Sequence, residues 1–584
     1  MKRSEKGSAL PLALLVLLLV SVLGVTLFSL GMTEVAIGTN WRAYSAAFYA
    51  AEAGVESGVV ALRTLLAKTP NPSDPDLNAI SGLGNAPTFL ETKNITFTAF
   101  SITRVLAAPS SYATTFTTGP YTGLSGIVTD YRVAAQVQGE GGTKASLTQI
   151  VKYVQIPLFQ FGVFYGKGVD LEIAPGPRMD FNGRVHANSD LYMVAGGAAP
   201  NGLNFDSYIT AAGKVYRRLK RDDPPVRGNN PQIKDANGNY QSLNFDHEYQ
   251  PGFASKWASE QDWKAKAESV FGPSPKESTL KDSTMGVGQI TPPVPDLFNN
   301  PSNPDVVAHQ MIEMPKAGDS PELASAKLYS EAGLRIIDGV ATDQNGGAVS
   351  LPAGSVTTKS FYDAREQKTV DVIEVDIGKL SPAKPANGVV YVASTVAPTG
   401  ATMPGVRLVN GSSLPSDGLT VVSQNPVYVK GDYNTALTGP GGANHPPAAI
   451  LADAVTVLSG SWDDTKGALT ANKRVATSTT VNAAFATGPS AESTVGQGNG
   501  QLENDIRFLE DWSSKTLTYS GSIIDLWHSQ QATAPWRCCV SNSNPYYYYS
   551  PPNRNWGYDT LFSTTPPPGT PMGVIMMKGQ WTQQ

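Results

Sequence analysis

The chain has 584 residues, enough for about two to four domains, and a formal net charge of −5. That charge gives no overall field to attract nucleic acid, so any such binding requires a local cationic patch. Two cysteines exclude a disulfide framework. A charged content of only 16%, together with 56 glycines and 43 prolines, favours a β-rich exported protein with many tight turns.

An uncharged apolar segment lies near the N-terminus. Residues 8–33 carry no charged side chain and follow the basic stretch MKRSEKG. At about 1.5 Å per residue this segment can cross a hydrocarbon layer about 30 Å thick, so we expect a membrane helix. Apolar residues then recur at helical spacing from Trp41 to Leu66. This predicts one helix of roughly 60 residues that ends before Pro70.

Two positions for N-terminal processing are compatible with this pattern. A secretory signal would be cut after its apolar core, and a turn would follow the cut. Here the apolar run is longer and continues into an amphipathic helix, which favours a cut before the run, between Gly7 and Ser8. The helix would then remain on the mature protein.

Residues 1–65 resemble the N-terminal region of PilX-type minor pilins, which belong to the type IV pilins. The resemblance rests on GSALPLALLVLLL from Gly7 and on AFYAAEAGVESGV at residues 47–59. It implies cleavage between Gly7 and Ser8 by a prepilin peptidase, a methylated mature N-terminus, and assembly with other pilins. Leu12 stands at the fifth mature position, where major pilins carry Glu. In the family this loss goes with minor subunits, notably at the filament tip.

Three segments after the helix alternate apolar and polar residues: 94–106, 129–139 and 143–159. Such alternation predicts half-buried β-strands, and the Gly-rich stretch 139–142 predicts a hairpin turn. We expect an antiparallel sheet onto which the apolar stripe of the helix packs. A helix on a small sheet is the head of a pilin in the family that the N-terminus resembles.

From about residue 161 the pattern changes to short apolar stretches separated by Gly, Pro, Asn and Asp. Strands of about four to six residues that turn at close intervals suit the rungs of a β-solenoid, with Val, Ile and Leu inward and polar corners. No strict repeat length is apparent, so a β-sandwich stays open as the alternative. Residues 253–272 and 320–333 are predicted to be helices beside the strands.

The strand-rich region resembles the large β-domain of ComZ-type competence minor pilins. The segments GRVHANSDLY, NPVYVKGDYN, AAILADAVTVLS and WGYDTLF carry this resemblance. We predict an α+β fold: a type IV pilin module, made of the long N-terminal helix plus an antiparallel sheet, carrying a large β-solenoid-like domain. The predicted domains are a leader peptide (1–7), a transmembrane and amphipathic helix (8–69), the pilin sheet (70–160), an inserted β-solenoid-like domain with flanking helices (161–535), and an aromatic- and Pro-rich C-terminal segment (536–584), for which a return to the pilin sheet is one option.

Catalytic patterns are weak. Asp463 and Asp464 are adjacent carboxylates, but on a strand they would face opposite sides, so a turn after Trp462 is the better interpretation. The five histidines show no ligand spacing, and the sequence has no HExxH motif and no Gly-rich phosphate loop. His186 is expected to be a hydrogen-bonded residue on a rung. We predict no enzymatic activity, no catalytic residue, no metal and no cofactor.

A cationic segment is the candidate for nucleic-acid binding. KVYRRLKR, residues 214–221, places five cations in eight residues around one tyrosine. If extended, it would present charge on both sides, follow phosphates and stack its tyrosine on a base. The alternative is a solvated edge strand, neutralised in part by Asp222 and Asp223. The ComZ-type resemblance implies DNA capture and favours the first interpretation. The DNA-binding candidates are Lys214, Tyr216, Arg217, Arg218, Lys220, Arg221 and Arg227.

Residues 536–559 are rich in aromatic side chains and hold both cysteines. Cys538 and Cys539 are adjacent, and outside the cytoplasm they could close a strained vicinal disulfide; a free or intermolecular pair stays open. Tyr546–Tyr549 and the nearby tryptophans could form a stacking platform for bases or sugars. Aromatic residues beside proline more often pack a loop onto a sheet, and packing is the interpretation we favour.

These features predict a minor, tip-located subunit of a type IV pilus that binds extracellular DNA for uptake in natural transformation. The alternative is a pilus-tip adhesin or an assembly-initiating subunit that binds a surface or glycan. The expected partners are other pilins, the prepilin peptidase, DNA, and the membrane through residues 8–33. We expect the protein in the inner membrane before assembly, and then in the extracellular pilus or at the cell surface.

Overall fold

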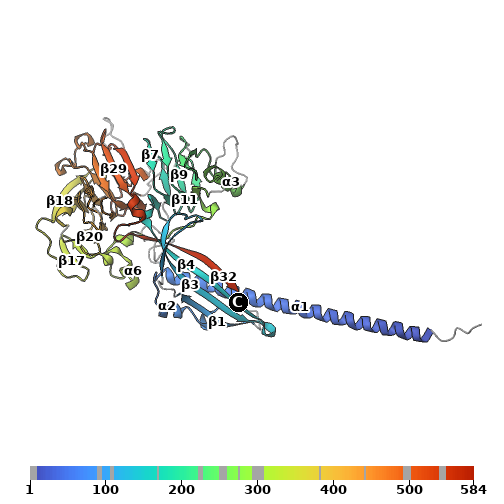
Figure 1. Cartoon of the computed structure of the whole chain (residues 1–584). Coiled ribbons are helices and arrows are strands. Elements are labelled where there is room, and N and C mark those ends of the chain that lie inside the picture. The colour runs from blue at the N-terminus through green and yellow to red at the C-terminus, as the bar shows by residue number, and fades with distance from the viewer. Residues whose placement is uncertain are drawn as a thin grey trace, which may run out of the picture. The chain divides into compact units, whose positions relative to one another are not determined.

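The computed structural model divides into two compact units, and the chain passes through each of them more than once (Figure 1). Unit 1 contains Met1–Tyr112, Val128–Tyr153 and Met576–Gln584, and unit 2 contains Ala113–Ile127 and Val154–Ile575. The structure describes residues 9–88, 95–105, 111–166, 170–220, 228–248, 259–273, 277–291, 308–380, 383–439, 442, 444–490, 502–537 and 547–583.

Unit 1 begins with one continuous helix, α1 (Ala9–Leu66), which is the long blue helix of Figure 1. This confirms the predicted uninterrupted helix. Its residues from Ala9 to Arg42 are exposed, and this part is long and apolar enough to cross a membrane. Further along, one side of α1 is buried at helical spacing. The buried residues are Ala47, Ala50, Ala51, Gly54, Val55, Gly58, Val59, Leu62 and Leu66.

A five-stranded sheet packs against the buried side of α1. Its strands are β1 (Thr96–Arg104), β2 (Tyr112–Thr115), β3 (Ser125–Gln138), β4 (Lys144–Pro157) and β32 (Met572–Gln583). The order is β1-β3-β4-β32, with β2 beside β3, and β1 pairs antiparallel with β3. The three strands predicted after the helix are thus confirmed as β1, β3 and β4, and the C-terminal strand joins the same sheet.

Two glycines let α1 approach this sheet closely. A Cβ atom on Gly54 would lie 2.5 Å from Cε1 of Phe97, and one on Gly58 would lie 2.5 Å from Cγ1 of Val133. Both distances are shorter than van der Waals contact. The spacing between helix and sheet therefore depends on glycine at these two positions.

Unit 2 contains two blocks of short strands. The first block comprises β5 (Val163–Tyr165), β6 (Leu171–Ile173), β7 (Met179–Phe181), β8 (Val185–Ala187), β9 (Leu191–Met193), β10 (Leu203–Phe205), β11 (Ile209–Ala211), β12 (Val215–Tyr216), β13 (Gln232–Lys234), β14 (Tyr240–Ser242) and β15 (Leu280–Lys281). The second comprises β16 (Leu334–Ile337), β17 (Val340–Asp343), β18 (Val356–Asp363), β19 (Lys368–Asp376), β20 (Val389–Ala393), β21 (Thr402–Val409), β22 (Leu419–Ser423), β23 (Val427–Lys430), β24 (Ala448–Ala452), β25 (Val455–Leu458), β26 (Thr479–Asn482), β27 (Ala484–Ala486), β28 (Ile506–Arg507), β29 (Thr516–Gly521), β30 (Ile523–Asp525) and β31 (Asn553–Tyr558).

Most neighbouring strands of unit 2 run parallel. In the first block every third strand returns to the same sheet, so that Val163 aligns with Val185 and Val185 aligns with Ile209. The same return aligns Leu171 with Leu191 on a second face. This arrangement differs from the antiparallel pairing of a β-sandwich, the alternative that the sequence left open.

The two strand blocks share one sheet. Its order is β15-β11-β8-β5-β30-β27-β24-β22-β20-β16-β17, in which β5 of the first block pairs parallel with β30 of the second. Every residue of β20, β22 and β24 is buried, as expected for parallel strands covered on both faces. The first and second blocks therefore have a common core.

Short helices flank these strands. They are α3 (Glu260–Phe271), α6 (Pro321–Ala326), α7 (Leu328–Glu331) and α8 (Ile377–Leu380), and unit 1 has α2 (Asp74–Ala79). The helix predicted at 253–272 appears as α3, and residues 253–258 lie outside the described part of the chain. Ser259 caps α3, because its hydroxyl accepts from the backbone N–H of Asp262.

The single helix predicted at 320–333 is wrong: the structure has two short helices there. Lys327 separates α6 from α7 with an extended backbone, φ −74° and ψ 138°. Its ammonium group is buried and lies 2.6 Å from the Asp319 carboxylate and 3.2 Å from the carbonyl of Met314. A buried charge needs such partners, and reaching them interrupts the helix.

Candidate ligand-binding site

The cationic segment lies in unit 2 and contains β12, an edge strand of the three-stranded sheet β12-β9-β6. Nζ of Lys214 is 2.8 Å from the Glu260 carboxylate, and Nζ of Lys220 is 3.0 Å from the Asp170 carboxylate. The hydrogen bond from Lys214 lowers the pKa of Glu260 and raises that of Lys214. The lysine side chains are 42% and 31% exposed, respectively. Each lysine therefore keeps a charge at the surface, shared with a carboxylate.

The two central arginines of the segment turn toward the protein. Arg217 is 7% exposed and donates to the carbonyl of Gly228 at 2.9 Å. Nε of Arg218 lies 2.9 Å from the Glu248 carboxylate, and its side chain is 15% exposed. The prediction that this segment presents charge on both sides is therefore wrong for its described residues. The physical reason is that the segment packs beside β9, where buried guanidinium groups need local acceptors.

The ring of Tyr216 also contacts other side chains of the protein. It stacks on Tyr192, with 4.9 Å between ring centroids, because parallel pairing places the two residues side by side. The guanidinium carbon of Arg218 lies 5.2 Å from the same ring. A base could stack on Tyr216 only by displacing one of these neighbours. Arg221 and Arg227, the remaining candidates, lie outside the described residues.

His186 has a structural environment, as expected. It is fully buried, its Nδ1 lies 2.8 Å from Oγ1 of Thr210, and its Nε2 lies 2.9 Å from Oδ1 of Asn188. Burial lowers its pKa to about 4. The prediction of a hydrogen-bonded histidine is confirmed, and His186 lies in the strand β8.

Asp463 and Asp464 form a turn, again as expected. The Asp463 side chain accepts from the backbone N–H of Thr465 and caps a short 3₁₀ helix. Asp464 pairs with the Arg407 guanidinium at 2.5 Å. Among the described residues, no group of three or more His, Cys, Asp or Glu could hold a metal ion.

Two tyrosines of the C-terminal aromatic segment pack into the core. Tyr548 and Tyr549 are buried, and Nε1 of Trp536 donates to the hydroxyl of Tyr549 at 2.9 Å. The packing interpretation is confirmed for these rings. Cys538 and Cys539 lie outside the described residues, so the choice between a vicinal disulfide and a free or intermolecular pair stays open.

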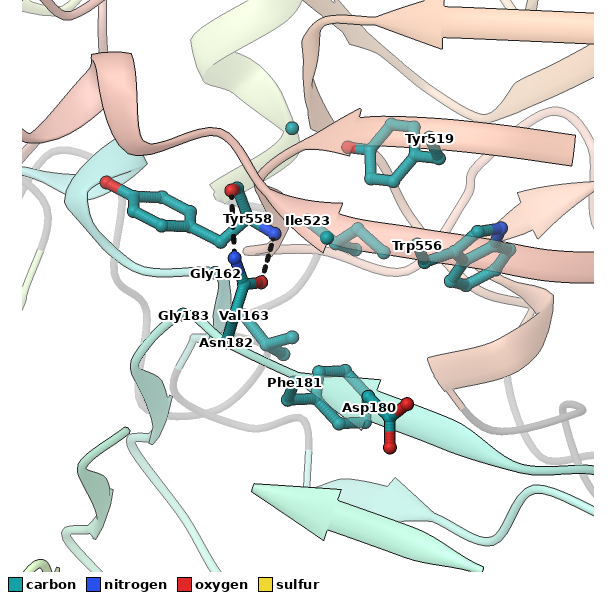
Figure 2. Close-up of a pocket in the computed structure, with 12 residues that line it drawn as sticks. Gly162, Val163, Asp180, Phe181, Asn182, Gly183, Tyr519, Ile523, Trp556 and Tyr558 are labelled. Carbon is teal, nitrogen blue, oxygen red and sulfur yellow. Dashed lines mark hydrogen bonds between the residues drawn. The ribbon is translucent and has the colours of Figure 1, made fainter. Parts of the chain in front are cut away.

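A groove in unit 2 is lined by residues from both strand blocks (Figure 2). It is shallow: the space within it, about 320 Å³, includes open solvent, so a ligand would lie on the groove rather than be enclosed by it. Four lining residues are aromatic and four are glycines, which leave space that side chains would fill. The lining comprises Gly162, Val163, Asp180, Phe181, Asn182, Gly183, Tyr519, Gly521, Ile523, Trp556, Gly557 and Tyr558.

The groove lies where two sheets end. β7 is the edge strand of a four-stranded sheet, and β31 is the edge strand of a three-stranded sheet. Asn182 links these edges, as Figure 2 shows: its Oδ1 accepts from the backbone N–H of Tyr558 at 2.6 Å, and its Nδ2 donates to the carbonyl of Tyr558 at 3.3 Å. The hydrogen bonds of one side-chain amide thus connect the two edges, where no backbone hydrogen bonds pair β7 with β31 in the described sheets.

Aromatic rings form the wall of the groove on the β31 side. Trp556 is half-buried and lies beside Tyr519, with 5.9 Å between ring centroids. The guanidinium carbon of Arg554 lies 5.3 Å from the Trp556 ring. On the β7 side, Phe181 is buried and stacks on Phe205 at 5.1 Å. The two strand blocks therefore contribute one aromatic wall each.

Asp180 is the carboxylate of the groove. It lies in β7, its side chain is 46% exposed, and it pairs with Arg178 at 2.8 Å. It also accepts a hydrogen bond of 2.7 Å from Nδ2 of Asn204. The groove therefore combines aromatic surface with an exposed acceptor whose charge Arg178 balances.

Comparison with known proteins bears on the N-terminus. Residues 6–56 match the family model described as PilX N-terminal. The matched segment contains most of α1, and it confirms the type IV pilin-like N-terminus that the resemblance implied. No curated protein and no solved structure matches the chain. The ComZ-type resemblance of the strand-rich region therefore stays a prediction.

Sequence reasoning found the PilX-like N-terminus but missed the groove. The sequence indicated the tryptophans of residues 536–559, which include Trp556, as candidates for stacking. It did not single out Asp180 or Phe181, which line the other side of the groove. Asn182 and Tyr558, which join the two edges, are 376 residues apart. Nothing local to either strand indicates that they meet.

Proposed function

We propose that this chain is a minor subunit of a type IV pilus. The structure of α1 carries the proposal: its first part is exposed and apolar, and its second part packs on an antiparallel sheet. The match to the PilX N-terminal family extends from the first part into the second. In this role α1 holds the protein in the inner membrane before assembly and in the filament afterwards. Leu12, in the place of the major-pilin Glu, supports a position at the filament tip.

The parallel strands of unit 2 are, in this proposal, a β-solenoid-like domain attached to the pilin module. The support is the repeated return of the chain to the same face, with three strands per turn in the first block. Inward apolar residues and stacked rings such as Phe181 on Phe205 repeat along this direction. Such a domain presents long exposed faces for binding outside the cell.

Shearing of pili from cells tests the assembly role. The wild-type chain is expected in the sheared pilus fraction. A Gly7→Val variant, blocked at leader cleavage, is expected to stay in the membrane fraction, and Ser4→Ala in the same leader serves as the matched control. Retention of the wild-type chain in the membrane, in cells that make pili, would contradict the proposal.

Capture of extracellular DNA is the finer role that we propose for this subunit. Lys214 and Lys220 support it, because both are partly exposed and both pair with surface carboxylates. Exposed ion pairs contribute only about 0–1 kcal/mol, so a phosphate can replace either carboxylate at low cost. Arg217 takes no part, since it is buried.

Salt-dependent binding tests the DNA role. The full chain in detergent is expected to bind a labelled DNA duplex, and to lose affinity between about 50 and 200 mM salt. The double variant Lys214→Ala, Lys220→Ala is expected to bind more weakly and with a smaller salt dependence. Lys264→Ala is the matched control, because Lys264 on α3 is 35% exposed and pairs with Glu268. Equal binding by the double variant and the control would refute these contacts.

A further inference from the structure

We infer that the groove between β7 and β31 binds an uncharged sugar residue of a surface glycan. The inference goes beyond the pilus role and DNA capture, because it concerns a separate site with a different chemistry. It rests on the shape of the groove, on its aromatic walls, on the hydrogen-bonding capacity of Asp180, and on the balance of charge at its rim.

The walls of the groove suit the flat face of a sugar ring. Trp556 is half-buried and offers part of its ring to a ligand, whereas Phe181 on the facing strand edge is mostly covered and forms the apolar base of the groove (Figure 2). The C–H groups on one face of a pyranose ring are apolar and carry partial positive charge, and aromatic faces carry partial negative charge. Because the groove is open to solvent, a ring would lie against its surface with the other face exposed.

Asp180 supplies the polar contact. A carboxylate has about four lone-pair sites. Nε of Arg178 lies 3.1 Å from Oδ1 and 2.8 Å from Oδ2, and Asn204 donates to Oδ1 at 2.7 Å. Because the side chain is 46% exposed, Oδ2 retains the capacity to accept a hydrogen bond from a sugar hydroxyl. Arg178 holds the carboxylate in place for this contact.

On the β7 side of the groove the charge disfavours a phosphate, whereas on the β31 side the Arg554 guanidinium lies 5.3 Å from the Trp556 ring. The exposed ion pair of Arg178 with Asp180 has no net charge, and the carboxylate is the partner that lines the groove. A phosphate at this position would be repelled by Asp180, whereas a neutral hydroxyl would not. An entirely apolar ligand would leave the carboxylate desolvated, which is costly. A neutral polyol with an apolar face meets both conditions.

The groove is fixed before any ligand arrives. β5 pairs with β30 beneath it, which joins the two strand blocks through backbone hydrogen bonds. Asn182 binds both backbone groups of Tyr558 across the gap. Gly183 maintains the close approach, since a Cβ atom there would lie 2.5 Å from Cβ of Tyr558. Binding therefore costs little reorganisation of the protein.

Titration with uncharged oligosaccharides tests the inference. The full chain, in a detergent without a sugar headgroup, is titrated with cellohexaose and with chitohexaose at 50 and 500 mM salt. We expect binding to at least one of them, with a dissociation constant that changes less than twofold with salt. Asp180→Ala and Trp556→Phe are each expected to weaken binding tenfold or more. Asp371→Ala is the matched control, because Asp371 is an exposed strand carboxylate that accepts from Ser360 at 2.6 Å.

Several results would overturn the sugar site. They are failure of the wild-type chain to bind either hexasaccharide, equal binding by Asp180→Ala and the control, and binding that falls steeply with salt. Binding of a single-stranded oligonucleotide that Trp556→Phe abolishes would instead assign the groove to nucleobases. Thermal unfolding of each variant shows whether it is folded. If Asp180→Ala unfolds early, Asp180→Asn, which keeps the shape and removes the charge, takes its place.

Discussion

The buried carboxyl group of Glu503 makes the stability of unit 2 depend on pH. Glu503 lies in a short 3₁₀ helix, Leu502–Asn504, and accepts a hydrogen bond of 2.9 Å from the backbone N–H of Ala174. Burial raises its pKa to about 7, although the charge of Arg554 acts to lower it. Glu172 and Asp505 are further acidic groups near Glu503, and burial raises the pKa of Asp505 as well.

The sign and size of the effect follow from proton linkage. In the unfolded chain a Glu side chain loses its proton near pH 4.5, whereas folded Glu503 keeps it to about pH 7. The folded state therefore binds more protons in this window, so stability is highest at low pH and falls as pH rises through it. At about 1.4 kcal/mol per pH unit, the free energy of unfolding falls between pH 4.5 and pH 7, and the total loss is about 3 kcal/mol.

Urea unfolding of wild type and Glu503→Gln at pH 5 and pH 9 measures this contribution. The variant is expected to lie within about 1 kcal/mol of the wild type at pH 5 and to be about 3 kcal/mol more stable at pH 9. His309 acts in the same direction, because Asp453 and Glu313 raise its pKa to about 9 against the opposing effect of burial. Its stabilisation is present below about pH 6.5 and is lost as pH rises through 9. Since both proteins contain His309, its contribution cancels in the comparison.

The reasoning is refuted if Glu503→Gln is no more stable than the wild type at pH 9. It is also refuted if the difference between the two proteins is the same at both pH values, because a carboxyl group that stays protonated or charged throughout contributes no pH dependence.

Two other substitutions test packing. Gly58→Leu on α1 is expected to destabilise unit 1 by about 1–3 kcal/mol, since a Cβ atom there overlaps the sheet. The control is Gly38→Leu, where a Cβ atom would have no other atom within 4 Å, and this variant should keep nearly the melting temperature of the wild-type protein. Arg474→Met should lower the free energy of unfolding in urea by at least about 3 kcal/mol, because the buried guanidinium donates to the carbonyls of Leu509, Gly467, Leu469 and Tyr548. Lys473→Met, at the exposed neighbouring residue, is the control. An equal effect of the two substitutions would contradict this role of Arg474.

The elements that the sequence predicted well are those with a local signal. Uninterrupted hydrophobicity and then helical spacing predicted α1 to its end at Leu66. Alternation predicted β1, β3 and β4, because each has one buried and one solvated face. The short strands of unit 2 were expected for a different local reason, since turn residues separate them at close intervals.

Long-range pairing had no such signal. β5 and β30 come from opposite ends of the strand-rich region, and the groove exists because they pair. The cationic segment was misjudged for the same reason: the carboxylates of Glu260 and Asp170 that meet its lysines are distant in sequence. The helix expected at 320–333 was interrupted by a buried ion pair of Lys327, which helical propensity does not register.

The N-terminus of the mature chain tests the central claim most directly. Mass spectrometry of pili sheared from cells that make this protein should find a mature chain that begins at a methylated Ser8 and retains all of α1. A chain found only in the membrane with its leader intact, or one that begins after residue 33, would contradict a role as a type IV pilus subunit.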